Sequence, residues 1–435
     1  MNPYSEYKDS NIQWLGKIPT HWLIKSSKHI FSFISRGSAP TYTNEENSTM
    51  VVNQAIFSQG KWDISKIRYT TECFDNSRGA LFPGDILIAS TGGGVLGKVF
   101  YFTKAEEQYI ADSHVTILRS NHKTINAKFY SYIFSISYNY INAVLALGST
   151  NQTELQRDML RCHKLPVPFF LEQQAIVDYL DRETAEMDAL ITEQEKLVSL
   201  LKQKRSAIIM EAVCRGLDPT VPMKESGVKW LGMVPENWSL TKIKFVTLLN
   251  PSYKQTIEAN TEIGYLPMEC VKNGYIIPRT IEYGKINSGL NFLQDGDIII
   301  AKVTPCFENG NIAVVSGLKR GIGFGSSELF VFRCFNINTF FLFYCLQCNT
   351  LKNLCISTMV GTGGLKRIPA SFIQNSFIPF PNDEIQHSIV NYLDHKTSEI
   401  DHLIAECETN IQLLKQRRTA LISEAVTGKI DVRTA

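Results

Sequence analysis

The stretch that decides the fold is residues 165–218, LPVPFFLEQQAIVDYLDRETAEMDALITEQEKLVSLLKQKRSAIIMEAVCRGLD, which returns as residues 378–431, IPFPNDEIQHSIVNYLDHKTSEIDHLIAECETNIQLLKQRRTALISEAVTGKID. About half of the aligned residues are identical. Two copies of such length are not the units of a solenoid, so they indicate two similar domains in one chain. Such a chain has pseudo-twofold symmetry, and we expect its partner to be twofold or bipartite.

Both copies of the stretch predict a long helix. Each opens with Pro-x-Pro, which requires extended backbone, and no further proline interrupts it. Apolar residues then recur every seven positions over about 40 residues, as in a coiled-coil seam. One such helix cannot bury its stripe alone, so we predict that the two pair as an antiparallel coiled coil. The predicted seam residues are Leu180, Met187, Leu190, Gln194, Leu197, Leu201, Ile208, Leu393, Ile400, Leu403, Cys407, Leu414 and Leu421.

The rest of the chain predicts two domains of mixed α/β (α+β) class. Short runs rich in Ile, Val and Phe, such as 85–90 and 297–302, are typical of strands bounded by Gly or Pro. We therefore predict globular domains at residues 1–165 and 219–378, alternating with spacer helices at 166–218 and 379–435. The seam residue Gln194 is expected to fix the helix register.

The charge is sorted along this repeat. The whole chain carries only +2, but the two domains carry +4 and +5 and the two helical segments −4 and −3. A basic domain suits a phosphate-bearing partner. The apolar fraction of 44% is that of a globular protein, and the sequence contains neither a signal-peptide pattern nor an apolar run of membrane-spanning length. We expect a cytoplasmic protein.

Patterns for catalysis and metal binding are incomplete. The segment 92–98, GGGVLGK, matches the start of a phosphate-binding loop, but Val99 stands where Ser or Thr should follow, and the next residues favour a strand. The segment 250–253, NPSY, differs from the Asn-Pro-Pro-Tyr loop of amino-methyltransferases, and turn chemistry explains it better. The pair Cys345 and Cys348 has no second ligand pair nearby, so core packing is favoured. The sequence predicts no cofactor, no metal and no catalysis in this chain.

Polar loops at matching places in the two domains are the candidate DNA contacts. Arg, Lys, Asn and Gln hydrogen-bond base edges, and Ser, Thr and Lys bind phosphate, although an ordinary solvated loop is the simpler interpretation of any single residue. The loops have similar frames and different sequences, as two readers of different targets require. The candidates are Arg36, Ser38, Thr41, Asn53, Gln54, Thr91, Gly93, Lys98, Ser113, His114, Asn151, Gln152, Tyr253, Lys254, Glu269, Lys302, Thr304, Asn309, Asn311, Ser327, Glu328, Lys366 and Arg367.

These features together resemble the specificity subunit of type I restriction-modification enzymes over the whole chain. The motifs are Trp-Leu-Gly-x-x-Pro-x-x-Trp at Trp14 and Trp230, the strands beginning PGDI at 83–86 and DGDI at 295–298, and Pro-x-Pro followed by Gln-x-x-Ile. The second domain also carries KVTPCFENG at 302–310. The first domain has the glycine loop instead, so its contacts cannot be copied from the second.

The resemblance implies a DNA-binding subunit that performs no chemistry. Each target-recognition domain would read half of a bipartite double-stranded target, and the helices would set the spacing and dock two modification (methyltransferase) subunits. The methyl donor, ATP and magnesium would belong to these and to the restriction (translocase and nuclease) subunits. The alternatives are a structural scaffold that binds protein alone, which has no need of basic domains, and a fused restriction-methylation enzyme, whose catalytic signatures are missing.

Overall fold

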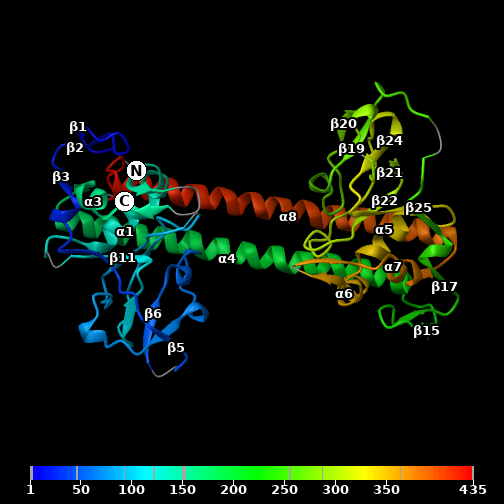
Figure 1. Cartoon of the computed structure of the whole chain (residues 1–435), viewed down its shortest axis with the longest axis horizontal. Coiled ribbons are helices and arrows are strands. Elements are labelled where there is room, and N and C mark those ends of the chain that lie inside the picture. The colour runs from blue at the N-terminus through cyan, green and yellow to red at the C-terminus, as the bar shows by residue number, and fades with distance from the viewer. Residues whose placement is uncertain are drawn as a thin grey trace. The chain divides into compact units, whose positions relative to one another are not determined.

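The computed structural model describes residues 3–45, 48–92, 94–120, 123–148, 153–253, 256–286, 288–362 and 364–433. The chain divides into two compact units, Met1–Gln194 with Asn410–Ala435, and Glu195–Thr409. Each unit holds one mixed α/β domain and part of each of two long helices, α4 (Phe170–Arg215) and α8 (Asp383–Val426), coloured green and orange to red in Figure 1. The predicted fold class is confirmed. Because this division does not separate helices from domains, the four predicted segment boundaries stay a prediction.

The first unit contains two four-stranded sheets. In the first sheet, all neighbours are antiparallel in the order β4 (Phe33–Arg36), β11 (Val115–Arg119), β8 (Ile86–Ala89) and β9 (Val99–Tyr101). The second has the order β10 (Tyr109–Ala111), β6 (Thr49–Val52), β7 (Arg68–Thr70) and β5 (Tyr42–Thr43), with β10 and β6 parallel. Smaller elements are β1 (Tyr7–Asp9), β2 (Lys17–Pro19), β3 (Leu23–Ser26), β12 (Ala146–Leu147), β13 (Glu154–Leu155), β14 (Lys164–Val167), α1 (Ala127–Ile136), α2 (Tyr138–Tyr140), a π-helix (Ile141–Leu145) and α3 (Arg157–Cys162).

The second unit repeats this plan. Its antiparallel sheet has the order β18 (Thr247–Leu249), β25 (Leu329–Cys334), β22 (Ile298–Ala301) and β23 (Ile312–Val314). Its other sheet has the order β20 (Arg279–Glu282), β19 (Glu262–Leu266), β24 (Ile322–Gly325) and β21 (Asn291–Gln294), with β19 and β24 parallel. Smaller elements are β15 (Met223–Glu225), β16 (Met233–Pro235), β17 (Ser239–Lys242), β26 (Val360–Thr362), β27 (Leu365–Arg367), β28 (Phe377–Phe380), α5 (Thr339–Gln347), α6 (Asn349–Ser357) and α7 (Ala370–Asn375).

The central strand of each antiparallel sheet is buried on both faces. In β8, Ile86 and Ile88 join one hydrophobic cluster, and Leu87 and Ala89 join another. The second unit shows the same alternation for the four residues of β22. Successive side chains of a strand point to opposite faces, so an unbroken apolar run fits a strand that is covered on both faces.

A buried carboxylate closes the turn before each central strand. Asp85 accepts hydrogen bonds from Arg119 at 2.6 and 2.7 Å, and Asp297 accepts two from Arg333 at 2.8 Å. Both aspartates are 1% exposed or less. The PGDI and DGDI motifs therefore encode a bidentate ion pair that joins neighbouring strands.

Matching polar contacts attach each domain to a long helix. The buried Gln173 accepts from the backbone N–H of Asn126 at 2.8 Å, and the buried Gln386 accepts from Asn338 N–H at 2.9 Å. Further along the second unit's α8, the Tyr344 hydroxyl donates to Asp394 at 2.6 Å. Since buried amide oxygens need donors, these glutamines fix the start of each helix on its own domain.

Three of the predicted seam residues are wrong. Leu190, Leu197 and Leu403 are 48%, 43% and 47% exposed. The neighbouring Ile191 and Val198 are buried in their place. Among the other predicted positions, Leu180, Met187, Leu393, Ile400 and Cys407 are buried, and Gln194, Leu201, Ile208, Leu414 and Leu421 are partly buried.

Polar residues at the second seam position explain the error. One set of seam positions begins at Leu180 and repeats every seven residues, and the second seam position lies four residues after each of them. Thr184 and Arg205 occupy this second position. Thr184 is buried because its hydroxyl donates to the Leu180 carbonyl at 2.6 Å. Arg205 packs its stem at the seam and donates to Asp401 at 2.9 Å. The apolar pattern is therefore interrupted at the true seam position. Leucines one residue earlier continue the heptad spacing and were assigned to the seam instead.

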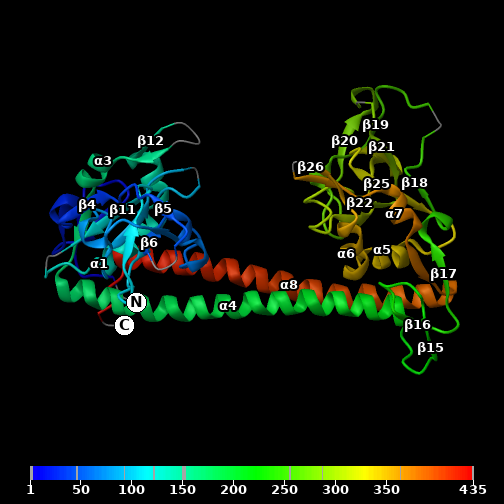
Figure 2. The same ribbon diagram turned by 60° about the horizontal axis from the view of Figure 1, so that its bottom comes forward.

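The helices run antiparallel within the second unit. Lys202 pairs with Glu408 at 3.1 Å, and Arg205 pairs with Asp401 at 2.9 Å. Residue numbers therefore fall along α8 in the direction in which they rise along α4. Figures 1 and 2 show α4 and α8 side by side. In the first unit, Arg418 pairs with Asp188 at 2.9 Å. These are the repeat counterparts of Arg205 and Asp401, so the duplication preserves both partners of the pair.

Candidate nucleic-acid interface

Four predicted contacts of the first domain gather beyond the end of β8. The Thr91 hydroxyl hydrogen-bonds His114 Nδ1 at 2.8 Å and donates to Gln54 at 3.5 Å. Arg36 forms an ion pair with Glu154, which faces Thr91 across an isolated β-bridge. We call Arg36, Gln54, Thr91, His114 and Glu154 the first-domain polar cluster.

The other first-domain candidates lie outside this cluster. Asn53 caps a short 3-10 helix by accepting from Ala55 N–H at 2.9 Å, and Lys98 lies over the Tyr138 ring at 4.8 Å. Ser38 donates to Glu72 at 3.2 Å, Thr41 is exposed on the loop before β5, and Ser113 is partly buried beside His114. Gly93, Asn151 and Gln152 lie outside the described residues.

Six predicted contacts of the second domain gather at the matching place. Lys302 donates to the Ser327 carbonyl at 2.6 Å, and Arg367 donates to Glu328 at 2.9 and 3.0 Å. The Thr304 hydroxyl accepts from Lys366 N–H at 2.9 Å. The second-domain polar cluster consists of Lys302, Thr304, Ser327, Glu328, Lys366 and Arg367.

The remaining second-domain candidates are separate. Tyr253 lies against the Phe292 ring at 4.7 Å between centroids, and Glu269 pairs with Arg279 at 3.2 Å. Asn309 and Asn311 line a cavity of about 620 Å³ between their loop and the α4 and α8 segments of this unit. Lys254 lies outside the described residues.

The two clusters occupy equivalent positions on equivalent strands. An isolated antiparallel bridge joins Thr91 to Glu154 in the first domain and Val303 to Arg367 in the second. At this position the first domain therefore carries a carboxylate and the second a guanidinium. The sequence-based candidates stop at Asn151 and Gln152 and do not include Glu154, which lies two residues further on. Only its pairing with a loop 63 residues earlier would have revealed it.

Glu328 and Arg367 of the second-domain polar cluster are both ionised. The hydrogen bonds from Arg367 lower the pKa of the Glu328 carboxyl, and the same bonds raise the pKa of Arg367. Both groups are thus charged at neutral pH. In the first domain, burial raises the pKa of Asp112, which accepts the backbone N–H of His114 at 2.9 Å.

The glycine loop does not lead into a helix. Strand β9 begins at Val99, directly after Lys98, so the loop lacks the helix N-terminus that binds phosphate in nucleotide sites. Cys345 and Cys348 are buried in the core of the second unit. In the part of the chain that the structure describes, no group of three or more His, Cys, Asp or Glu side chains is arranged to hold a metal ion. None of the described helices is long and apolar enough to cross a membrane.

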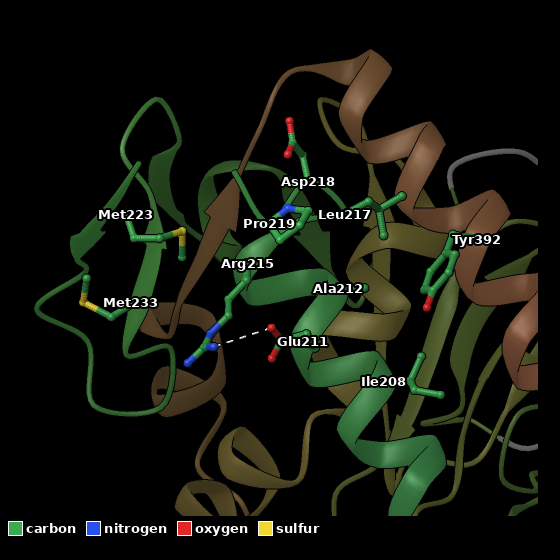
Figure 3. Close-up of a pocket in the computed structure, with 11 residues that line it drawn as sticks. Ile208, Glu211, Ala212, Arg215, Leu217, Asp218, Pro219, Met223, Met233 and Tyr392 are labelled. Atoms are coloured by element: carbon green, nitrogen blue, oxygen red, sulfur yellow. Dashed lines mark hydrogen bonds and ion pairs between the residues drawn. The ribbon is translucent and has the colours of Figure 1, made fainter. Parts of the chain in front are cut away.

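A cavity of about 750 Å³ lies at the C-terminal end of α4 (Figure 3). Most of its lining residues are apolar, among them Met223, Met233 and Tyr392. Two of its three charged side chains, Glu211 and Arg215, pair with each other at 3.5 Å. No predicted contact residue lines it, so it is not the candidate interface.

Comparisons with known proteins agree with this architecture. Residues 19–200 match the model of the type I restriction modification DNA specificity domain. The chain is 30% identical over 195 residues to the EcoEI specificity subunit of Escherichia coli, covering 44% of this chain and 33% of that protein. It is 22% identical over 360 residues to the MjaVIII specificity subunit of Methanocaldococcus jannaschii, covering 80% of each.

A solved structure from work on complex assembly and conformational transition of the type I R-M system has a similar fold. Its TM-score is 0.68 at 15% identity, with 95% of this chain and 99% of that chain covered. The resemblance seen in the sequence is confirmed: the fold is that of a two-domain specificity subunit. The match to the EcoEI specificity subunit spans about a third of that protein's length.

Proposed function

We propose that this chain is the DNA-recognition subunit of a type I restriction-modification complex and that each domain reads one half of a bipartite duplex target. The observation that carries the proposal is the pair of polar clusters. They lie at equivalent positions on equivalent strands, yet one presents Glu154 and the other Arg367. Similar frames with different side chains suit a target whose two halves differ in sequence.

The chemistry is assigned to partner subunits. The modification subunits, two in number, would bring the methyl donor, and the restriction subunits would bring ATP and magnesium. Supporting this, the glycine loop continues into β9, and its residues are therefore free to serve as a recognition loop. The chain itself contributes base contacts, phosphate contacts and spacing.

Removing two cations from the second cluster tests the proposal. We expect Lys366→Ala with Arg367→Ala to weaken binding of the target by about tenfold or more and to lower the slope of log K against log salt by up to about 2. The complex with its modification subunits is titrated with duplexes in which one half or the other is scrambled. The variant should lose the preference for one half only.

The matched control removes two cations from the same domain. Lys319 and Arg320 are exposed neighbours in the turn before β24. Their double alanine variant should keep the preference for both halves. If the complex of the unchanged chain shows no salt-dependent preference for either half, DNA recognition is excluded and the scaffold alternative gains.

The long helices are proposed to dock the modification subunits through exposed leucines. Within the second unit, the ion pairs of Lys202 and Arg205 line one edge of the helix pair. At 100° per residue, Leu197 lies on the edge of the α4 seam opposite Lys202, and Leu403 lies on the edge of the α8 seam opposite Glu408. Antiparallel pairing brings these two edges to the same face of the helix pair. Leu200, 51% exposed, extends that face. An apolar stripe beside a closed seam suits packing of a further helix.

Serine at Leu197 and Leu403 should weaken this association. Burial of one leucine stabilises by about 1.5–3 kcal/mol, so the pair of changes should raise the dissociation constant for the modification subunit about a hundredfold or more. Sedimentation or mass photometry of mixed subunits measures this. Gln203→Ser, on the outward face of α4, is the control. Equal affinity of the leucine variant and this control would remove the helix face from the interface.

A further inference from the structure

The second-domain hairpin has the dimensions of a groove reader. Strands β26 and β27 have three residues each, and every one of the six is exposed. Figure 2 shows β26 at the periphery of its unit. A two-stranded ribbon fits the major groove of B-DNA, where each base pair presents a distinct hydrogen-bonding pattern. Arg367 is the last residue of this hairpin.

The guanidinium of Arg367 is held by one edge. Its Nε donates to one carboxylate oxygen of Glu328 at 3.0 Å, and its Nη2 donates to the other at 2.9 Å. A planar guanidinium has five N–H donors, so the edge formed by Nη1 and the second hydrogen of Nη2 is left for a ligand. Within the described residues, no hydrogen bond to Nη1 is formed. The side chain is 50% exposed, so that edge is accessible.

The charge beside Arg367 favours a base over a phosphate. Glu328 is ionised, and its carboxylate lies in contact with the guanidinium. The carboxylate offsets much of the attraction that the guanidinium would exert on a phosphate, whereas two hydrogen bonds to a neutral base edge depend less on the net charge of the site. Guanine offers that edge in the major groove through N7 and O6, and bidentate arginine is its commonest protein partner.

We propose that Arg367, oriented by Glu328, binds the N7 and O6 edge of one guanine in the half of the target read by the second domain. This rests on the proposed function. The Arg367 guanidinium is pre-organised, because the ion pair with Glu328 fixes its rotamer before DNA binds. The binding therefore selects one G·C pair at one position.

The first domain uses its arginine differently. Arg36 pairs with Glu154 through Nη1 and donates to the Leu155 carbonyl through Nη2 at 3.2 Å, so each terminal nitrogen already makes one hydrogen bond within the domain. The acceptor that Glu154 offers to DNA at this place is its second carboxylate oxygen, which suits the amino group of cytosine, and the side chain is 46% exposed. The two halves of the target are therefore expected to carry different bases at the positions facing these residues.

The test is competitive binding of duplexes substituted one base pair at a time, with the complete modification complex at low salt. The target sequence is first found by mapping methylated bases in a host that carries the complex. We expect one G·C pair in one half to be preferred by about 10- to 100-fold, and we expect Arg367→Ala to reduce that preference to about 1. Arg367→Gln should transfer it to A·T, since glutamine pairs with adenine.

Two further variants separate reading from folding and from simple charge. Glu328→Ala frees the guanidinium and should lower the preference at the same base pair without moving it. Lys366→Ala should weaken all duplexes equally and leave the preference intact, because a phosphate contact carries no base information. The inference is overturned if Arg367→Ala binds with every preference of the unchanged chain. A wild-type complex with no bipartite preference would instead overturn the proposed function, so the two failures are distinct.

Discussion

Replacing Asp297 with alanine should destabilise the second domain by about 3–5 kcal/mol, the cost of removing one partner of a buried ion pair. Asp297 is 1% exposed and accepts two hydrogen bonds from Arg333 and one from the backbone N–H of Gln294. Alanine leaves the guanidinium and the turn N–H without their acceptor. Because the pair joins the turn before β22 to β25, the loss falls on the centre of the sheet that carries the second polar cluster.

Hydrogen exchange of the full chain resolves this effect by domain. Amides of β22 and β25 should exchange faster in the variant, while those of β8 and β11 keep their protection. Asp85→Ala should give the reverse pattern, since Asp85 and Arg119 make the same pair in the first domain. Glu282→Ala, which removes an exposed carboxylate paired with Lys285, should change stability by no more than about 1 kcal/mol. A loss of that small size for Asp297→Ala would show that the pair does not hold the sheet.

The frame of the fold could be predicted because its signals are local. The apolar run at 297–302 predicts the buried strand β22 within a residue at each end, and heptad spacing predicts α4 and α8. The seam was partly misassigned where polar Thr184 and Arg205 occupy it. Their burial depends on a helix carbonyl and on Asp401, neither of which apolar periodicity can register.

The candidate site was only partly predictable, for a reason of distance along the chain. Lys302, Glu328 and Arg367 were singled out separately as donor-rich or acidic loop residues, and only the sheet brings them together. Asn53 looked equivalent to them, yet its side chain caps a turn two residues away. Glu154 gave no signal because its place opposite Thr91 is set by pairing between distant segments. Loop function is thus decided by which strands end beside each other.

Shortening both long helices by one heptad should change the spacing of the target and nothing else in it. Deleting residues 189–195 from α4 and the facing residues 411–417 from α8 keeps the seven-residue seam period in both helices and spares Leu197 and Leu403 of the proposed docking face. It also retains the ion pairs of Arg205 with Asp401 and of Arg418 with Asp188. Seven residues of helix measure about 10 Å, which corresponds to about three base pairs of B-DNA.

Mapping of methylated bases should then show two unchanged half-sites whose unread gap is shorter by about three base pairs. A gap shorter by one or two would indicate that DNA twist absorbs part of the change, since three base pairs also rotate one half by about a quarter turn or more. The matched control exchanges residues 189–195 for their repeat counterparts 402–408 without altering length, and it should leave the gap unchanged. An unchanged gap in the deletion variant, with methylation intact, would mean that the helices do not set the spacing.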